Sequence, residues 1–271
     1  MRVEIKDDFD LKKIADSGQC FRWQPIEDNG YRIIHRGKCL CIYKVDGYVY
    51  ELDCTKEEYE SIWSDYLDMS EDYGTIRSKI DKKSDPFLYE AAEHERGIRI
   101  LRQDPWESLI SFIISQNRNI PAIKASIEKL SEKAGVQKKD TRGEIYYTFP
   151  TPEAIVNMSD EDVAYCKFGY RDKYITEFAK SVVSGNIDFE GLNVGDDEEV
   201  LKSLTNIYGV GKKVASCMLL FGFHRLNAFP IDVWIKRVLE TEYSDGYPFE
   251  VYSPYNGVYQ QYMFAYYRNK Q

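Results

Sequence analysis

The chain is 271 residues long and carries a formal net charge of −9, with 43% hydrophobic and 30% charged residues. These proportions are ordinary for a globular protein of one or two domains and exclude intrinsic disorder. No apolar run approaches the ~20 residues of a membrane span, and the start, MRVEIKDDFD, does not resemble a signal peptide. We therefore expect neither membrane insertion nor secretion.

The negative charge is concentrated in the first third of the chain. Residues 1–93 contain 14 basic and 21 acidic residues, whereas the remainder has a net charge of −2. A negative total disfavours a nucleic-acid partner, but this distribution allows a local basic face in the later part. Charge alone therefore excludes neither DNA nor protein as a partner.

The six cysteines indicate a reduced protein without a metal cluster. Only Cys39 and Cys41 are close in sequence, and in a strand their side chains would share a face. No CxxC pair or Cys/His quartet occurs, and no cysteine follows Cys217. We therefore expect neither a zinc site nor an iron–sulfur cluster.

The first third of the chain is predicted to form an antiparallel sheet. Its three β-branched or aromatic runs, separated by glycine turns, are Tyr31–Arg36, Leu40–Lys44 and Tyr48–Leu52. A helix is predicted at Thr55–Leu67, because Thr55 suits the N-cap and Glu58 the capping-box position.

The remainder of the chain has helical periodicity. Two helices are predicted to begin at Pro105 and close to Pro121, since proline suits the first turn of a helix. We therefore predict an α+β fold, with an N-terminal antiparallel sheet domain at residues 1–93 and an all-helical domain at residues 94–271.

A glycine turn between two predicted helices is the first functional signal. The turn Gly209-Val210-Gly211 leads directly into a helix that opens with Lys212 and Lys213. The free N–H groups and the positive dipole end of such a helix suit a DNA phosphate. An ordinary αα-hairpin gives the same pattern, so the turn alone leaves both readings open.

A lysine and an aspartate supply the second signal. The helix dipole and the neighbouring Lys212 disfavour the ammonium form of Lys213, and a lowered pKa is what a nucleophilic amine requires. Nineteen residues later, Asp232 follows Pro230-Ile231 at the start of another helix. The carboxylate could stabilise positive charge on a sugar while the amine captures the anomeric carbon of an N-glycoside. A solvated lysine and a plain N-cap aspartate remain the alternative.

The glycine turn, the lysine and the PxD motif resemble the helix–hairpin–helix DNA glycosylases. More closely, the chain is similar to bacterial 8-oxoguanine DNA glycosylases, and the matching motifs run in order through nearly the whole chain. They are SGQCFRW at 17–23, LRQDPWESLISFIISQNRNI at 101–120, FGYR at 168–171, and PYNG at 254–257 with Gln260 and Phe264.

The resemblance implies a base pocket around Lys213. Lys213 would form the Schiff base and Asp232 would be the catalytic carboxylate. The base would lie between Cys217 and Phe264, with Gln260 contacting its Watson–Crick edge.

Gly18 resembles the glycine whose carbonyl accepts a hydrogen bond from the damaged base. 8-Oxoguanine carries a hydrogen on N7, whereas N7 of guanine is an acceptor and would repel a carbonyl oxygen. The target nucleotide must leave the base stack to reach such a pocket.

The resemblance also implies DNA contacts outside the pocket. They are Asn117 in the vacated space, Arg118 at a phosphate or base, Tyr170 as wedge, Arg171 at the orphaned cytosine, and Gly209, Gly211 and Lys212 at a phosphate. No cofactor is required, but a structural monovalent cation or calcium ion is implied at the carbonyls of Thr205, Ile207 and Val210.

Four positions depart from the family pattern. Ala122 replaces a second cytosine-contacting arginine, which predicts a relaxed preference for the opposite base, and Arg118 could supply a contact instead. Trp234 stands where the family often has a phosphate-binding histidine, and Tyr267 stands where an aspartate is expected. These two differences concern phosphate binding and pocket shape.

The resemblance implies a bifunctional enzyme, a DNA N-glycosylase and abasic-site lyase of base excision repair. Its partner would be duplex DNA containing 8-oxoguanine, with no membrane contact, and it would act as a monomer in the prokaryotic cytoplasm at the nucleoid. An alkylpurine glycosylase, which uses the aspartate without a lysine, is disfavoured by Lys213 and Gln260. A non-catalytic DNA-binding module and a protein-interaction domain are the rival classes.

Overall fold

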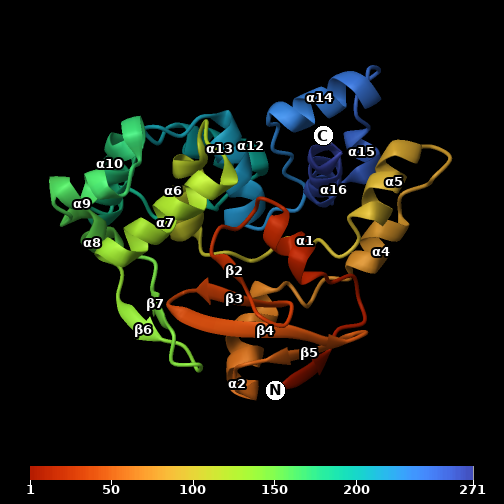
Figure 1. Cartoon of the computed structure of the whole chain (residues 1–271). Coiled ribbons are helices and arrows are strands. Elements are labelled where there is room, and N and C mark those ends of the chain that lie inside the picture. The colour runs from red at the N-terminus through yellow and green to blue at the C-terminus, as the bar shows by residue number, and fades with distance from the viewer. Residues whose placement is uncertain (271) are drawn as a thin grey trace.

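A five-stranded antiparallel sheet forms the N-terminal side of the molecule (Figure 1). The structure is a computed structural model that describes residues 1–270. The strand order is β1-β5-β4-β3-β2. The strands are β1 (Arg2–Glu4), β2 (Trp23–Ile26), β3 (Gly30–His35), β4 (Lys38–Asp46) and β5 (Val49–Leu52). The three predicted strands are confirmed as β3, β4 and β5, whereas the two edge strands were not predicted.

Left-handed backbone positions form the hairpins between the central strands. Arg36 and Gly37 have φ values of +45° and +72° and join β3 to β4, while Gly47, at +49°, lies between β4 and β5. Two successive positive φ values match the right-handed twist of the flanking strands, and glycine adopts such values without strain.

The helix predicted at Thr55–Leu67 is present, with a change of helix type inside it. The Thr55 side chain and Glu58 form the expected capping box at the start of α2 (Lys56–Glu58). A π-helical turn, η1 (Tyr59–Trp63), follows and leads into α3 (Ser64–Tyr66). Trp63 and Tyr66 are buried against the sheet core.

The remaining elements are helices, apart from one small hairpin that was not predicted. Helices in the first half are α1 (Leu11–Asp16), α4 (Tyr73–Ser78), α5 (Pro86–His94), α6 (Pro105–Ser115) and α7 (Ile120–Ala134). The small hairpin consists of β6 (Gln137–Lys139) and β7 (Ile145–Tyr147). Later helices are α8 (Pro152–Val156), α9 (Asp160–Tyr165), η2 (Gly169–Arg171), α10 (Asp172–Val183), α11 (Phe189–Leu192), α12 (Asp197–Thr205), α13 (Lys212–Cys217), η3 (Met218–Gly222), α14 (Val233–Glu242), α15 (Phe249–Tyr252) and α16 (Asn256–Asn269). The predicted fold class, a sheet domain followed by a helical region, is confirmed.

The helices form two groups above the sheet (Figure 1). One group contains α6 to α10 with α12 and α13, and the other contains α4, α5 and the C-terminal helices. Helix α16 packs against α5 and α14, and most of its residues are buried. No helix within residues 1–270 has the length and apolar character that crossing a membrane requires.

Two hydrophobic cores underlie this arrangement. The smaller lies between the sheet and the helices α1 and α3, and the larger lies among the helices. Tyr73, Ile76 and Leu88, which belong to α4 and α5, are part of the larger core. The division at residue 93 therefore stays a prediction, and two helices before it pack with the helical region.

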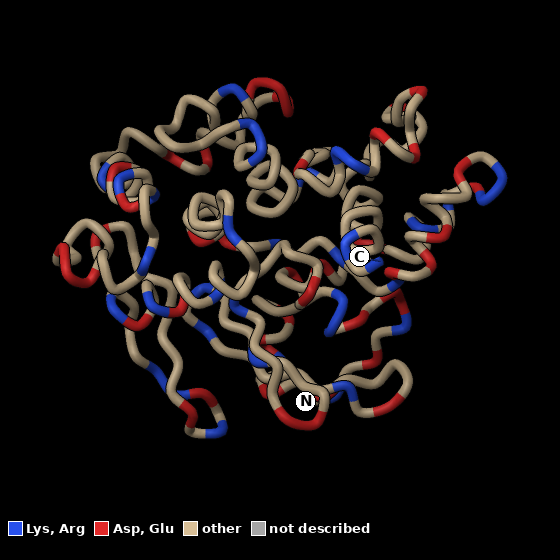
Figure 2. The backbone as a smooth tube through the Cα atoms, turned by 45° about the horizontal axis from the view of Figure 1, so that its top comes forward, with Lys and Arg blue, Asp and Glu red and all other residues tan. Residues whose placement is uncertain are grey.

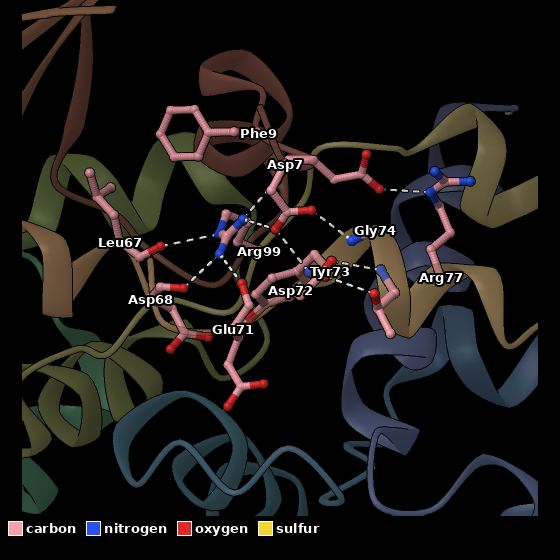
Figure 3. Close-up of polar contacts among 12 residues, drawn as sticks. Asp7, Phe9, Leu67, Asp68, Glu71, Asp72, Tyr73, Gly74, Arg77 and Arg99 are labelled. Carbon is pink, nitrogen blue, oxygen red and sulfur yellow. Dashed lines mark hydrogen bonds and ion pairs between the residues drawn. The ribbon is translucent and has the colours of Figure 1, made fainter. Parts of the chain in front are cut away.

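A fully buried arginine connects the N-terminal segment to the start of the helical region (Figure 3). Arg99 donates from Nε to the Leu67 carbonyl at 3.2 Å and from Nη2 to the carbonyls of Asp68 and Glu71 at 2.6 and 2.7 Å. Its Nη1 donates to Asp7 Oδ2 at 2.6 Å and to the Asp8 carbonyl at 3.0 Å. All five N–H donors of the guanidinium thus have a partner.

Gln19 fixes the SGQ turn to the segment that follows Arg99. Its Nε2 donates to Ser17 Oγ and to the Arg99 carbonyl, both at 2.8 Å. Its Oε1 accepts from the Leu101 backbone N–H at 2.8 Å, and its carbonyl accepts from Gln103 Nε2 at 2.9 Å. These buried bonds hold the turn against the helical region.

Candidate active site

A cavity of about 1000 Å³ lies where segments from the whole chain meet. Seven of the residues singled out from the sequence line it: Gly18, Asn117, Arg118, Lys213, Asp232, Trp234 and Phe264. They come from the turn after α1, the loop between α6 and α7, α13, the start of α14, and α16. Four lining side chains are basic and one is acidic.

This excess of basic side chains is local. Lys and Arg are interspersed with Asp and Glu over the chain as a whole (Figure 2), and the total charge is −9. The cavity is therefore electropositive relative to the rest of the protein, as a site for a phosphodiester backbone requires.

Lys213 stands in the first turn of α13 with an exposed side chain. Its Nζ lies 5.8 Å from the centre of the Phe112 ring, over the face of the ring. Phe112 in turn stacks on Phe221 of η3, with ring centroids 5.5 Å apart. The Lys213 amine thus lies over a stacked pair of aromatic rings at the edge of the cavity.

Cys217, one turn after Lys213 on α13, is buried. Burial raises the pKa of the Cys217 thiol, the neighbouring Lys213 opposes this rise, and Asp232 adds to it. The thiol is therefore neutral at physiological pH and lies close to the amine, but Cys217 is not among the residues that line the cavity, and its contact with a base stays a prediction.

Asp232 is the N-cap of α14. Its Oδ1 accepts from the backbone N–H groups of Trp234 at 3.0 Å and Ile235 at 2.9 Å. The structure describes no ion pair between this carboxylate and Lys213, although both line the cavity. Capping and a functional role are compatible, because the cap fixes the carboxylate toward the cavity.

Gly18 and Phe264 touch across the cavity wall. Gly18 has a φ of +80°, and a Cβ at this position would lie 3.2 Å from Cε1 of Phe264. The backbone conformation therefore favours glycine, and a Cβ would also need the Phe264 ring to move by a few tenths of an ångström. Among residues 1–270, no hydrogen bond reaches the Gly18 carbonyl, so it is a free acceptor.

Gln260 lies one turn before Phe264 but does not line the cavity. It is buried, donates from Nε2 to the Pro230 carbonyl at 2.9 Å and accepts from Gln261 Nε2 at 3.0 Å. Contact with a base would require its side chain to exchange these bonds. Its role stays a prediction.

The loop between α6 and α7 carries Asn117 and Arg118. Asn117 is exposed with a φ of +50°, a left-handed conformation that asparagine tolerates better than most residues. Arg118 donates to the Lys167 carbonyl at 3.2 Å, and burial together with nearby Arg171 lowers its guanidinium pKa. Both side chains line the cavity, as a DNA-contacting role requires.

The FGYR turn presents its two functional candidates differently. Tyr170 is 57% exposed, whereas Arg171 is 5% exposed. Arg171 donates to the carbonyls of Phe168 and Gln116, and its guanidinium lies 4.2 Å from the centre of the Tyr170 ring. Tyr170 is available as a wedge, whereas Arg171 would have to leave these carbonyls to contact a base.

The glycine hairpin between α12 and α13 is fixed to the rest of the site. A Cβ on Gly209 would lie 2.3 Å from Cγ of Tyr174, and the Gly209 carbonyl accepts from Gln116 Nε2 at 3.0 Å. Gly211 is the N-cap of α13 and has open space where a Cβ would stand. Lys212 beside it is exposed. Backbone N–H groups are thus accessible to a phosphate.

The predicted cation ligands lie in the same turn. Thr205 is the last residue of α12, so its carbonyl lacks a helical partner. The Ile207 carbonyl accepts from the Val210 N–H at 3.0 Å. Carbonyl oxygens are the donors that hard cations prefer, so these residues fit the implied ion. The site stays a prediction.

Arg268 is a cavity residue that the sequence analysis missed. It stands one turn after Phe264, with its guanidinium 5.1 Å from the centre of that ring, and it donates to the Asp16 carbonyl at 2.5 Å. Its buried Nη1 has no partner within residues 1–270, and burial lowers its pKa. The sequence could have indicated this residue, because a position four residues after Phe264 lies on the same face of a helix.

Comparison with known proteins agrees with this geometry. Residues 2–109 match the family described as 8-oxoguanine DNA glycosylase, N-terminal domain, and residues 110–245 match the family described as HhH-GPD superfamily base excision DNA repair protein. The chain belongs to this superfamily. The resemblance seen in the sequence motifs is thereby confirmed.

Two solved structures and one curated relative show how far the similarity extends. MBOgg1 in complex with a low-affinity DNA ligand has 40% sequence identity and a TM-score of 0.92, covering 99% of this chain and 95% of that one. The 8-oxoguanine glycosylase/lyase of Clostridium acetobutylicum, in complex with dsDNA containing cytosine opposite 8-oxoG, has 35% identity and a TM-score of 0.89, covering 100% and 98%. N-glycosylase/DNA lyase OGG1 of Arabidopsis thaliana is 32% identical over 82% of this chain, which spans 63% of the Arabidopsis protein.

Proposed function

We propose that this protein removes 8-oxoguanine from duplex DNA and then cleaves the strand at the abasic site. The observation that carries the proposal is that Lys213 and Asp232 line the same cavity as Gly18 and Phe264. Nucleophile, carboxylate, carbonyl acceptor and aromatic wall are thus all within one space. The similar proteins named N-glycosylase/DNA lyase support the same activity.

The proposed chemistry uses the Lys213 amine as the nucleophile. Its Nζ attacks C1′ of the flipped nucleotide, the C1′–N9 bond breaks, and the electron pair leaves with the base, which takes up a proton. Asp232 stabilises the positive charge that develops on the sugar. The C1′–O4′ bond then opens to give a Schiff base, loss of a C2′ proton expels the 3′ phosphate, and water releases Lys213.

Selection of the damaged base is assigned to Gly18. Its carbonyl is free to accept the N7–H of 8-oxoguanine, whereas guanine would bring a second lone pair against it. Loss of one such bond and gain of one repulsion discriminate by about 1–3 kcal/mol. The aromatic ring of Phe264, which lies next to Gly18, would stack on one face of the base, at right angles to this in-plane hydrogen bond.

Three finer assignments complete the proposal. Because Ala122 stands where a second cytosine-contacting arginine is expected, the enzyme discriminates less strongly between the bases opposite the lesion. A monovalent cation or calcium ion binds the hairpin carbonyls and helps to hold a phosphate, and no cofactor is required for catalysis. The enzyme acts as a monomer at the nucleoid in a prokaryotic cytoplasm.

Borohydride trapping on duplexes with 8-oxoguanine opposite C, A, G or T tests the proposal. We expect a covalent adduct that disappears in Lys213→Gln and persists in Lys212→Gln, the matched lysine one position earlier. Base release without an adduct would indicate a lysine-independent glycosylase. Neither adduct nor released base would leave a DNA-binding module, and loss of DNA affinity in Lys213→Gln would contradict a purely catalytic role.

A further inference from the structure

A cluster of side chains that could bind a metal ion lies outside the cavity. It lies where β4 meets the loop of the β6–β7 hairpin, two segments that Figure 1 shows close together. The Sγ atoms of Cys39 and Cys41 and a carboxylate oxygen of Asp140 lie within 4.8 Å of one another. Both cysteines belong to β4, and Asp140 directly follows β6. The sequence predicted no zinc site, because the third donor comes from a distant segment.

Strand geometry brings the two thiols together. Cys39 and Cys41 are two residues apart in β4, so their side chains point to the same face of the sheet. Cys41 pairs with Arg32 of β3 on one side, and on the other its carbonyl accepts from the Asp53 N–H at 2.9 Å. The hairpin covers this face, since Lys138 Nζ donates to the Gly37 carbonyl at 2.9 Å.

Asp140 offers this cluster an oxygen that accepts no hydrogen bond. Its Oδ1 accepts from the backbone N–H groups of Arg142 and Glu144, both at 2.9 Å. Its Oδ2 is buried without a hydrogen-bond partner within residues 1–270, and the side chain is 2% exposed. Arg32 Nη1 forms an ion pair with Oδ2 at 3.6 Å, which is too long for a hydrogen bond. The lone pairs of Oδ2 are therefore available to a metal ion, in place of the hydrogen bond that a buried carboxylate oxygen normally accepts.

The surrounding charges fit a divalent cation. Two acidic side chains, Asp140 and Asp53, and two basic ones, Arg32 and Arg142, surround the thiols, so their formal charges cancel. A divalent cation bound by two thiolates adds no net charge to these surroundings.

We propose that Cys39, Cys41 and Asp140 bind a thiophilic divalent cation, with Zn²⁺ as the best match. Zn²⁺ takes Cys and Asp ligands at about 2.3 and 2.1 Å in a tetrahedron, which places the ligand atoms roughly 3.5–3.8 Å apart. The donors therefore need to close by at most about 1 Å. Water would fill the fourth position.

The site would link the N-terminal sheet to the helical region. β4 belongs to the sheet and the β6–β7 hairpin extends from the helical region, so one ion would bridge two segments about 100 residues apart. The ion takes no part in base excision, since none of its ligands lines the cavity.

Zinc titration of the full-length, reduced protein against a chromophoric chelator tests the proposal. We expect one Zn²⁺ per chain in the wild type, none in Cys39→Ser/Cys41→Ser, and one in Cys54→Ser, a matched half-buried cysteine of the same domain. Asp140→Asn keeps both thiols and the Oδ1 acceptor, and its affinity should fall at least tenfold. Free Zn²⁺ at a hundred times Kd should raise the melting temperature of the wild type by roughly 5–10 °C. The melting temperature of the double variant should not change.

Cobalt substitution provides a second measurement. Co²⁺ bound to thiolates gives sulfur-to-metal charge-transfer absorption, expected in the wild type and in Cys54→Ser. Equal Zn²⁺ binding by the wild type and the double variant would overturn the proposal, as would the absence of stoichiometric binding in the wild type. If the double variant does not fold, the Zn²⁺ affinity of Asp140→Asn is the deciding measurement. An affinity equal to that of the wild type would also overturn the proposal.

Discussion

Replacement of Arg99 by methionine is expected to be among the most destabilising single changes in this protein. Arg99 is fully buried, and its five N–H donors all go to the Asp7 carboxylate or to backbone carbonyls. Methionine fills a similar volume but donates no hydrogen bond. The Asp7 carboxylate keeps its bonds from the Tyr73 and Gly74 N–H groups, whereas the carbonyls that Arg99 bonded lose a charged donor.

The magnitude follows from those lost partners. Breaking a buried ion pair by removing one member costs about 3–5 kcal/mol. The low end applies to Asp7, which is 24% exposed and keeps two backbone donors, but the carbonyls left without a donor add to the loss. We therefore expect Arg99→Met to lower the free energy of unfolding by at least about 4 kcal/mol, which corresponds to a melting temperature lower by at least roughly 10 °C.

Urea unfolding followed by circular dichroism measures this difference. The control is Arg2→Met, because Arg2 pairs with Glu51 on the surface, with side chains 67% and 49% exposed. Exposed pairs contribute about 0–1 kcal/mol. A loss below about 1 kcal/mol in Arg99→Met, or one equal to that of the control, would refute the argument that the buried guanidinium connects these segments.

Three further predictions concern the cavity and its surroundings. Gly209→Ala should lower the free energy of unfolding by about 2–4 kcal/mol and weaken DNA binding, because its Cβ would lie 2.3 Å from Cγ of Tyr174. Gly211→Ala has open space for its Cβ and should weaken DNA binding alone. Binding isotherms and unfolding curves of both variants check this difference. Burial raises the pKa of Glu107 to about 8 from 4.5; between these values the folded state keeps a proton that the unfolded state has released, so stability falls as pH rises. Glu107→Gln should remove that fall between pH 5 and 9, and an unchanged slope would contradict it. Phe264→Ala should raise KM and lower kcat together in glycosylase assays, and an unchanged rate would exclude Phe264 from the base pocket.

Local patterns in the sequence were sufficient for the elements with strong turn or capping chemistry. The Arg36-Gly37 turn and the Thr55 capping box both appear where they were predicted. Strand β2 was missed because it contains Pro25, which cannot donate to a sheet; the strand is nevertheless possible because β2 is an edge. Strand β1 is three residues long, too short for any periodicity.

The candidate site was predictable as a set of residues and less so as a set of conformations. The motifs identified Lys213 and Asp232, and both line the cavity. The sequence could not show that Arg171 and Gln260 are held by backbone carbonyls, because their partners Gln116 and Pro230 are distant in sequence. Such hydrogen bonds depend on tertiary packing, which the spacing of residues in the sequence does not reveal.

The contact between Gly18 and Phe264 has a consequence for synthesis of the protein on the ribosome. Phe264 follows Gly18 by 246 residues, so the two partners are synthesised far apart in time. A nascent chain can therefore complete its sheet and its glycine hairpin and still lack one wall of the cavity. The wall is completed only after α16 has left the ribosome exit tunnel, so a chain that has not reached α16 should carry the Lys213 amine without the aromatic ring on the other side of the cavity.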